Sequence, residues 1–358
     1  MEAVYMPIVK CKQGELLALR RLDKLAKSKI LPLLEFQDIP KSWTDGTWVY
    51  KKTLDVHISD TISDCQRSLP SLPFAFDFMH FNPSVSLGGT SLAYRFLEAS
   101  ISAGLSFYPV VRVKSSLHFL RVLSSFSRRD LIPGICLRVE AEFVDSDLAE
   151  TIRNIVSYTG VSQNRIIVVI DVKDVVASKA TMHAEFVRYT INLLTKGDTW
   201  AAVFVAGSSA PQSMAGIPVG ISSTPRTEWE VFKIVRSSLS EIPLLYSDYA
   251  IGNPNPMPDI DPRILFDRAI AKIIYTTAND YIIIRGNRVR RYGYGQYQEM
   301  CSSIIEHPWF AGAGFSWGDL KIQDCQAGET STGNLTTWVQ VNTNHHIEHV
   351  VHQIASMF

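Results

Sequence analysis

The sequence has few cysteines, and their spacing suggests neither a disulfide-bonded fold nor a zinc site. Only five cysteines occur among its 358 residues, and no two of them form a CxxC pair. Structural zinc ribbons need paired cysteines at short spacing, and small disulfide-stabilised folds need a denser set of them. The sequence therefore argues against both classes and favours a protein whose thiols stay reduced.

An excess of charge of one sign is also missing, and so is a long apolar run. Lysine plus arginine and aspartate plus glutamate number 35 each, so binding to nucleic acid or to an anionic membrane needs a local patch. No stretch reaches the roughly 18 apolar residues of a membrane span. The N-terminus lacks the basic flank and apolar segment of a signal peptide. We therefore predict a cytoplasmic protein without a membrane partner.

Short apolar runs alternate with amphipathic stretches along residues 1–249. Runs such as RIIVVIDV are apolar throughout, which is typical of parallel strands buried on both faces. We predict helices at Glu15–Lys27, Ser91–Ser102, Ser115–Ser127 and Ala184–Leu194, and a helix with a loop in the long stretch Asp38–Leu72. The predicted strands are Met6–Lys10, Ile30–Phe36, Phe74–Phe78, Phe107–Val113, Gly134–Glu140, Arg165–Asp171, Ala201–Ala206 and Pro243–Asp248. This alternation predicts a (β/α)8 TIM-type barrel, with an open doubly wound sheet as the competing fold.

The character of the sequence changes after Tyr249. A proline-rich turn over residues 252–262 precedes two β-like runs, Lys272–Thr276 and Tyr281–Arg285, which are spaced as a hairpin. Helical patterns follow at Gly293–Ile305 and Ile347–Ser356. We predict that residues 250–358 form a C-terminal extension that packs on the barrel, so that the chain is one structural unit.

Charged residues stand at the ends of nearly all the predicted strands, where barrels of this type build their sites. The acidic candidates for a general acid or base, or for ligands of a divalent cation, are Glu35, Asp77, Glu140, Asp171 and Asp248. The basic candidates for holding a phosphate or carboxylate are Lys10, Lys12, Arg112, Arg138 and Lys173. Two alternatives stay open: the charges can neutralise one another as structural ion pairs, or they can simply meet water at the rim.

Arginines and tyrosines lie among glycines in the segment RGNRVRRYGYGQYQ, Arg285–Gln298. Guanidinium groups bind phosphate and aromatic rings stack on bases, so Arg285, Arg288 and Tyr292 are candidates for contacting a nucleotide or a single strand. The alternative is a solvated basic turn after the hairpin.

Histidines recur near the C-terminus in NHHIEHVVHQI. On a helix, His345, His349 and His352 would share a face, and the i, i+4 pair His345 and His349 would offer a transition metal two ligands. The HEXXH motif is absent. The alternative is a structural role, with Asn344 or Thr343 as the N-cap of the helix.

Several segments resemble the Beta protein family, which is named after a phage protein. They are YMPIVKCKQGELLALRRL and ILPLLEF near the N-terminus, and GFSWGDLKI, TGN and NHHI near the C-terminus. The resemblance covers nearly the whole chain and implies one barrel-like unit, met in phages and bacteria in settings of conflict between the two, but it supplies no reaction. The residues that fall on the family's pattern are Lys12, Glu15, Glu35, Arg285, Gly286, Ser316, Trp317, Asp319, His345 and His346.

Together these patterns predict a phage-related or antiviral-defence protein that binds a phosphate-bearing ligand at the C-terminal mouth of the barrel. The ligand would be a nucleotide or a nucleic-acid end. Metal-assisted phosphoester hydrolysis is the reaction class that such carboxylates and arginines would serve, with a divalent metal as the cofactor considered. The alternative is a non-catalytic scaffold for a protein partner in a phage-defence system, since barrels host many unrelated functions.

Overall fold

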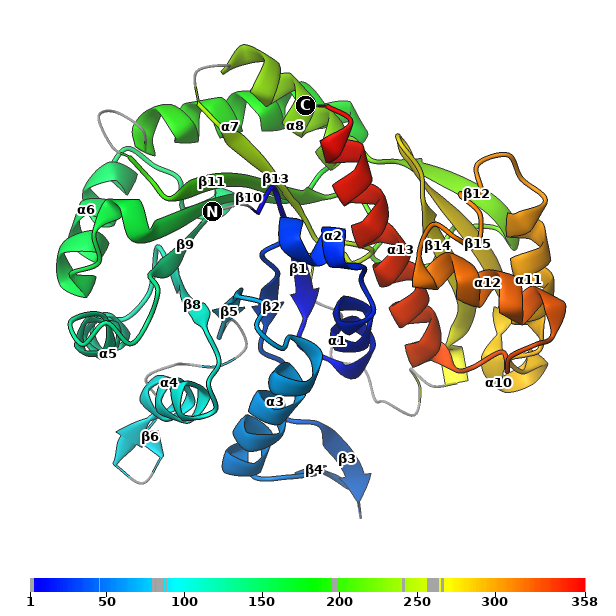
Figure 1. The fold of residues 1–358 in the computed structure, drawn as a ribbon, viewed down its shortest axis with the longest axis horizontal. Helices are drawn as coiled ribbons and strands as arrows, with labels where there is room; N and C mark the ends of the chain where they lie inside the picture. The colour runs from blue at the N-terminus through cyan, green and yellow to red at the C-terminus, as the bar shows by residue number, and fades with distance from the viewer. Residues whose placement is uncertain are drawn as a thin grey trace.

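The predicted barrel is present in the computed structural model, which describes residues 3–44, 46–78, 81, 86–87, 89–194, 199–239, 242–255, 264 and 267–357. Eight parallel strands close in the order β1-β13-β11-β10-β9-β8-β5-β2, with helices around them (Figure 1). The closed order rules out the open doubly wound sheet. The strands are β1 (Tyr5–Lys10), β2 (Leu33–Glu35), β5 (Phe74–Asp77), β8 (Phe107–Arg112), β9 (Ile135–Glu140), β10 (Ile166–Asp174), β11 (Ala202–Ser208) and β13 (Leu244–Asp248).

Side chains alternate between the interior of the barrel and the helices that surround it. Met6, Ile8 and Phe204 belong to the cluster that fills the interior, while Tyr5 and Val9 of β1 pack outward against the helices. Burial on both faces explains the continuous apolar runs in the sequence. The same alternation decides which strand-end residues face the mouth of the barrel. The residues that point into the barrel recur at every second position up to the C-terminal end of each strand.

The helices around the barrel differ from the predicted ones mainly near the N-terminus. The predicted helix Glu15–Lys27 is two helices, because the Asp23 side chain accepts a hydrogen bond from the Ala26 N–H (2.6 Å) and starts a second one. The stretch after β2 holds a hairpin as well as a helix. The elements are α1 (Gln13–Arg20), α2 (Lys24–Lys29), β3 (Lys41–Thr44), β4 (Thr47–Tyr50), α3 (Leu54–Ser68), β6 (Ser86–Leu87), β7 (Thr90–Ser91), α4 (Leu92–Ser102), α5 (Leu117–Ser127), α6 (Leu148–Thr159), α7 (Ala180–Leu194) and α8 (Thr227–Ser238), with short 3-10 turns at Ala141–Phe143, Gln163–Arg165 and Ala177–Lys179.

The C-terminal extension is built around an antiparallel sheet of three strands in the order β12-β15-β14. The predicted hairpin is confirmed as β14 (Ile270–Thr276) and β15 (Asp280–Arg288). The third strand, β12 (Gly220–Pro225), comes from the connection between β11 and α8, within the range assigned to the barrel. Residues 256–262 of the proline-rich turn lie outside the described residues. The helices that pack on this sheet are α10 (Val289–Tyr292), α11 (Gln296–Ile305), α12 (Trp317–Ala327) and α13 (Leu335–Ala355).

Helix α13 is longer than predicted and lies between the barrel and the rest of the extension (Figure 1). Its N-cap is Asn334, whose side chain accepts a hydrogen bond from the Thr337 N–H (3.1 Å). The predicted cap at Thr343 or Asn344 is wrong, because both residues are buried in the middle of the helix. No helix in the described part of the chain, α13 included, is long and apolar enough to cross a membrane.

Replacing Asn334 with alanine should lower the free energy of unfolding by about 1 kcal/mol, because α13 loses its capping hydrogen bond. Thr343→Val is the matched control. It removes a hydroxyl that has no hydrogen-bond partner in the described structure and keeps the shape of the side chain, so it should not reduce stability. Urea unfolding followed by circular dichroism measures both. A greater loss for Thr343→Val than for Asn334→Ala would contradict this assignment of the cap.

Candidate functional site

Charged side chains from six strands come together at the C-terminal end of the barrel. The strand register pairs Glu35 with both Lys10 and Asp77, and it pairs Arg112 with Arg138. All the strand-end candidates except Lys12 and Asp248 belong to this set. We call it the mouth ring; it consists of Lys10, Glu35, Asp77, Arg112, Arg138, Glu140, Asp171 and Lys173.

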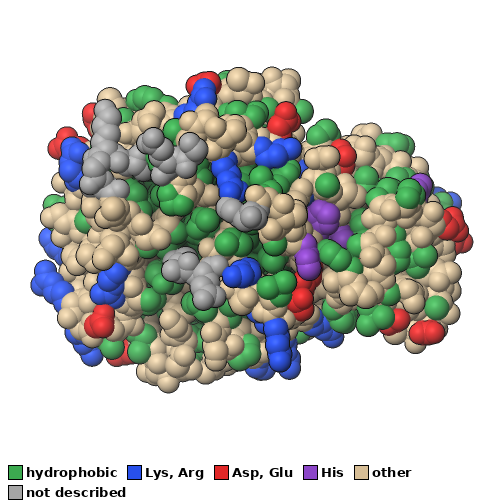
Figure 2. Space-filling model, turned by 45° about the horizontal axis from the view of Figure 1, so that its top comes forward, with side chains coloured by type: hydrophobic (Ala, Val, Ile, Leu, Met, Phe, Trp, Pro, Cys, Tyr) green, Lys and Arg blue, Asp and Glu red, His purple; other side chains and the backbone are tan. Residues whose placement is uncertain are grey.

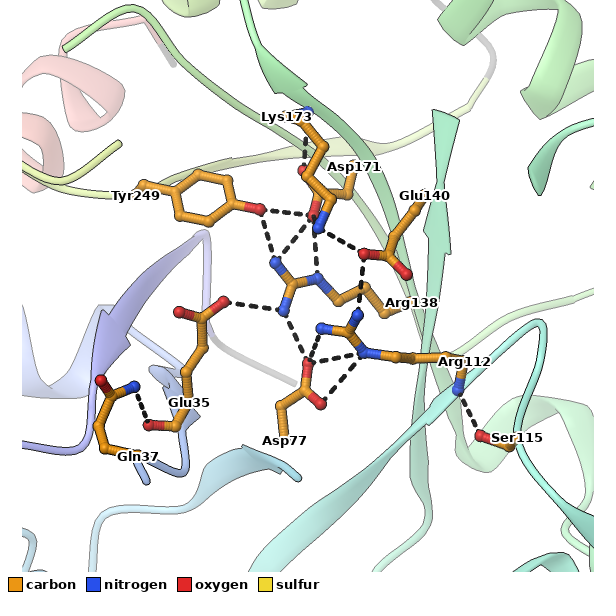
Figure 3. Close-up of polar contacts among 10 residues, drawn as sticks. All are labelled: Glu35, Gln37, Asp77, Arg112, Ser115, Arg138, Glu140, Asp171, Lys173 and Tyr249. Atoms are coloured by element: carbon orange, nitrogen blue, oxygen red, sulfur yellow. Dashed lines mark hydrogen bonds and ion pairs between the residues drawn. The ribbon is translucent and has the colours of Figure 1, made fainter. Parts of the chain in front are cut away.

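Arg138 lies at the centre of the mouth ring and has no exposed surface (0%). Its Nε donates to Asp171 (2.9 Å), and its Nη1 donates to Glu35 (3.1 Å) and Asp77 (2.7 Å). Its Nη2 donates to the Tyr249 hydroxyl (2.6 Å), which in turn donates to Asp171 (2.6 Å). Figure 3 shows the guanidinium enclosed by these groups. One side chain therefore joins residues from four different strands or strand ends.

Arg112 and Lys173 extend the same network toward solvent. Arg112 donates from Nη2 to Asp77 (2.8 Å) and from Nη1 to Glu140 (2.9 Å). The Lys173 ammonium pairs with Glu140 and lies 3.6 Å from Asp171. Three of the five basic groups that the sequence offered for a phosphate, Arg112, Arg138 and Lys173, are thus already paired with carboxylates in the ring (Figure 3). In this part of the site the charges therefore neutralise one another as ion pairs, which was one of the alternatives left open by the sequence.

The backbone is strained beside the ring. Lys173 has a φ of 60°, and β10 shifts its register between Asp171 and Asp174. This turn brings the Lys173 N–H to the Asp171 carboxylate (2.9 Å). Ala250, directly after Tyr249, has a φ of 50°. Left-handed conformations of such residues occur where surrounding contacts hold them, often at functional sites. Nothing in the sequence signals either one.

The charges of the ring depend on one another. Burial alone would raise the pKa of Asp77, but the positive charges of Arg112 and Arg138 outweigh it and lower that pKa below its usual value. Burial opposes ionisation of Asp171 in the same way, and Arg138 and Lys173 reverse its effect, so the pKa of Asp171 is also lowered. Both carboxylates are therefore ionised at neutral pH, and a metal ion at either would have to displace a guanidinium group.

Asp248 lies apart from the mouth ring, on the outer side of its strand. It accepts hydrogen bonds from the Tyr5 hydroxyl (2.5 Å) and from Nε2 of His346 (2.9 Å). The other ring nitrogen of His346 contacts the Thr276 hydroxyl (2.8 Å). Burial lowers the pKa of His346 despite the neighbouring Asp248 charge, so the imidazole is neutral. Asp248 thus joins the barrel wall to the extension and does not face the mouth.

The rings of His345 and His349 lie close together, with their centres 5.9 Å apart, but His345 has no nitrogen left for a metal. Both nitrogens of His345 are engaged, Nδ1 with Asp319 (2.8 Å) and Nε2 with the Thr276 carbonyl (2.9 Å). His349 is half-buried, and its Nε2 has no hydrogen-bond partner in the described structure. Burial, followed by the nearby His345 imidazole, lowers the pKa of His349 to about 2.

A second basic group lies beside the mouth, where the extension sheet meets the barrel. Lys272 and Arg285 are opposite one another in β14 and β15, on the face whose Ile274 and Tyr281 pack on Ala210 of the barrel. Burial and then the charge of Lys10 lower the pKa of Lys272, and the same two causes lower that of Lys12. We call Lys10, Lys12, Lys272 and Arg285 the basic wall. In the described part of the chain none of the four has an ion-pair partner.

The arginine–tyrosine segment is not the loop that its sequence suggested. It forms the end of β15 and α10, and only Arg285 faces the barrel. Arg288 and Tyr292 are exposed, and Arg291 lies over the Tyr292 ring (5.3 Å). Sequence reasoning missed Lys272, although the alternation in the hairpin places it opposite Arg285.

Arg138→Met should lower the free energy of unfolding by about 3–5 kcal/mol, because three buried carboxylates lose their shared cation. Arg188→Met is the control, since Arg188 forms a partly exposed ion pair with Glu185 on α7 and should contribute about 1 kcal/mol or less. Equilibrium unfolding in urea measures both. Equal effects would show that the mouth ring does not depend on Arg138.

Acid should destabilise the protein through Asp77 and Asp171, whose pKa values are lowered in the folded state. Their contribution is complete above the unfolded pKa, near about 3.9, and is lost as pH falls through the folded values. The slope of the unfolding free energy against pH, measured from about pH 5 downward, should be shallower in Asp77→Asn. Asp130→Asn, at a side chain that is 83% exposed, should keep the wild-type slope. An unchanged slope in Asp77→Asn would count against ionisation of the ring.

Comparison with known proteins gives one family and no activity. Two solved structures each share 12% sequence identity with the chain. Triosephosphate isomerase from Bartonella henselae has a TM-score of 0.35, and the match covers 70% of this chain and 93% of that one. The second structure, 2,3-dimethylmalate lyase, a PEP mutase/isocitrate lyase superfamily member, has a TM-score of 0.37, with 74% of this chain and 89% of that one covered. Likeness at this level supports no inference about reaction. A search of curated proteins finds no match. The family profile described as Beta protein matches residues 5–352, nearly the whole chain. The chain therefore belongs to the Beta protein family.

Proposed function

We propose that the mouth of the barrel binds a phosphate-bearing ligand, a nucleotide or a nucleic-acid end, against the basic wall. The observation that carries this proposal is that Lys10, Lys12, Lys272 and Arg285 lie beside one another without carboxylate partners in the described structure. The Arg285 Nε is buried and donates a hydrogen bond to no partner there. Glu15 and Asp38 offset part of the charge of Lys12 without forming an ion pair with it. Cations that repel one another favour an anion between them. Phosphate, which accepts several charge-assisted hydrogen bonds, suits such a group.

Phosphoester hydrolysis is the reaction that the neighbouring mouth ring would support. Glu35 is opposite Lys10 in the strand register, so this member of the mouth ring is next to the basic wall. Arg138 holds one of its oxygens (3.1 Å), and its Oε2 has no hydrogen bond in the described structure. Glu35 is therefore the candidate general base or acid. If a divalent metal assists, Glu35 would hold it, since Asp77, Glu140 and Asp171 are paired with guanidinium or ammonium groups of the ring.

The test is a thermal-shift and binding screen of the protein against nucleotides, short oligonucleotides and divalent metals. A ligand of the folded state raises stability by about 2.7 kcal/mol at a hundredfold excess over its Kd. Lys272→Ala and Arg285→Ala should each weaken binding by about tenfold, as expected when a charged hydrogen bond is lost. Arg129→Ala, an exposed residue elsewhere on the barrel, is the control.

Glu35→Gln separates catalysis from binding. It should leave the Kd of the phosphate-bearing ligand close to the wild-type value and abolish turnover of a phosphoester substrate. Turnover that persists in Glu35→Gln would refute its catalytic role. Binding that is equal in wild type, Lys272→Ala and Arg285→Ala would refute the basic wall as the ligand site.

A non-catalytic scaffold is the second candidate. The internal pairing of Arg112, Arg138 and Lys173 with carboxylates supports it, because such a network stabilises the barrel without any ligand. The scaffold would be favoured if no ligand in the screen bound or shifted the melting temperature while a pull-down retained a protein partner. The cytoplasmic location, expected from the composition, stays a prediction. So does a place in conflict between phages and bacteria, which the family resemblance implied.

A further inference from the structure

Three potential metal ligands meet where the N-terminal helices contact α13. Asp23 lies between α1 and α2, and Glu348 and His352 are about one turn apart on α13. A ligand atom of each residue lies within 4.8 Å of those of the other two. Spacing of i and i+4 places two side chains on the same face of a helix, which is how helices commonly offer a metal two ligands.

Glu348 points to a ligand at this place. Its side chain is buried, with 1% of the residue exposed. Its Oε1 accepts a hydrogen bond from the Asp23 N–H (2.7 Å), whereas its Oε2 has no hydrogen-bond partner in the described structure. A buried carboxylate oxygen without a partner is costly, and such atoms usually mark a missing water or ion. A cation between Glu348, Asp23 and His352 would satisfy it.

The other two residues leave the cluster open to solvent. Asp23 and His352 are both exposed. One Asp23 oxygen caps α2 through the Ala26 N–H (2.6 Å), which fixes the direction of its carboxylate. The His352 ring rests against Phe315, with the ring centres 5.2 Å apart. Figure 2 shows histidine side chains grouped at the boundary between the larger and the smaller lobe of the molecule. An ion can therefore enter from solvent and keep a water ligand.

We propose that Asp23, Glu348 and His352 bind a divalent transition-metal ion, with zinc as the first candidate. An imidazole nitrogen with two carboxylate oxygens suits zinc or a neighbouring first-row ion, whereas magnesium and calcium prefer oxygen alone. Three protein ligands leave a fourth position open, as in zinc sites that bind water or substrate. The site shares no residue with the mouth ring or the basic wall, so it stands independently of the proposed function.

Zinc binding to tag-free, full-length protein tests the proposal. Competition with a chromogenic chelator should give one zinc ion per chain. Asp23→Asn, Glu348→Gln and His352→Gln should each weaken its binding by about tenfold or more, since even the loss of a group that only orients a ligand costs that much. His118→Gln and Glu299→Gln, at exposed residues of α5 and α11, are matched controls and should bind zinc as the wild type does.

Cobalt(II) identifies the ligand atoms. Its absorption spectrum in the wild type should show coordination by nitrogen and oxygen, without the sulfur-to-metal charge transfer that the buried cysteines would produce. His352→Gln should lose this spectrum while keeping the circular dichroism of the wild type, because His352 is exposed. Wild-type protein that binds no zinc, or a His352→Gln variant that binds it with unchanged affinity, would overturn the proposal.

Discussion

The mouth of this barrel depends on one buried guanidinium group. Arg138 is enclosed by the carboxylates of Glu35, Asp77 and Asp171, which arrive on three other strands. A buried charge is tolerated only when opposite charges and hydrogen bonds surround it, so this one side chain constrains the ends of the strands that carry its partners. The strained turn at Lys173 is held by one of these carboxylates, that of Asp171. Any ligand at the mouth therefore meets a preorganised set of charges.

A second polar network makes the extension part of the barrel. His346 links α13 to Asp248 of the barrel wall, and His345 links the same helix to Asp319 of α12. Ser316 hydrogen-bonds to Asp319 in turn (2.5 Å). Ser316, Asp319, His345 and His346 belong to the C-terminal motifs of the family resemblance, and they meet in this interface and not at the mouth. This part of the family pattern thus describes how the two parts join, whereas Lys12, Glu35 and Arg285 of the same pattern belong to the mouth ring or the basic wall.

The barrel was predictable from the sequence because strand burial on both faces is a local signal, and so was the hairpin of the extension. The inward ring of Glu35, Asp77, Arg138 and Asp171 followed from the strand ends. Asp248 was misplaced among them, because a strand that is apolar on both faces does not show which face its last residue joins. Strand β12, GISSTP, has no apolar run and could not be recognised without its partner. The burial of His345 and His346 on α13 likewise depends on segments that are distant in the sequence.

The position of β12 in the sequence affects how the chain can fold while it is being synthesised on the ribosome. This strand is synthesised with the barrel, between β11 and α8, while its neighbour in the sheet, β15, is synthesised later. Until then it presents unpaired backbone groups of the kind that recruit other chains. Asp248 likewise lacks its hydrogen bond from His346 until that later part of the chain has been synthesised. A nascent chain that stalls after the eighth barrel strand would thus expose an open sheet edge and leave one Asp248 oxygen without its hydrogen bond from His346. Chaperone contact is expected to concentrate in that interval.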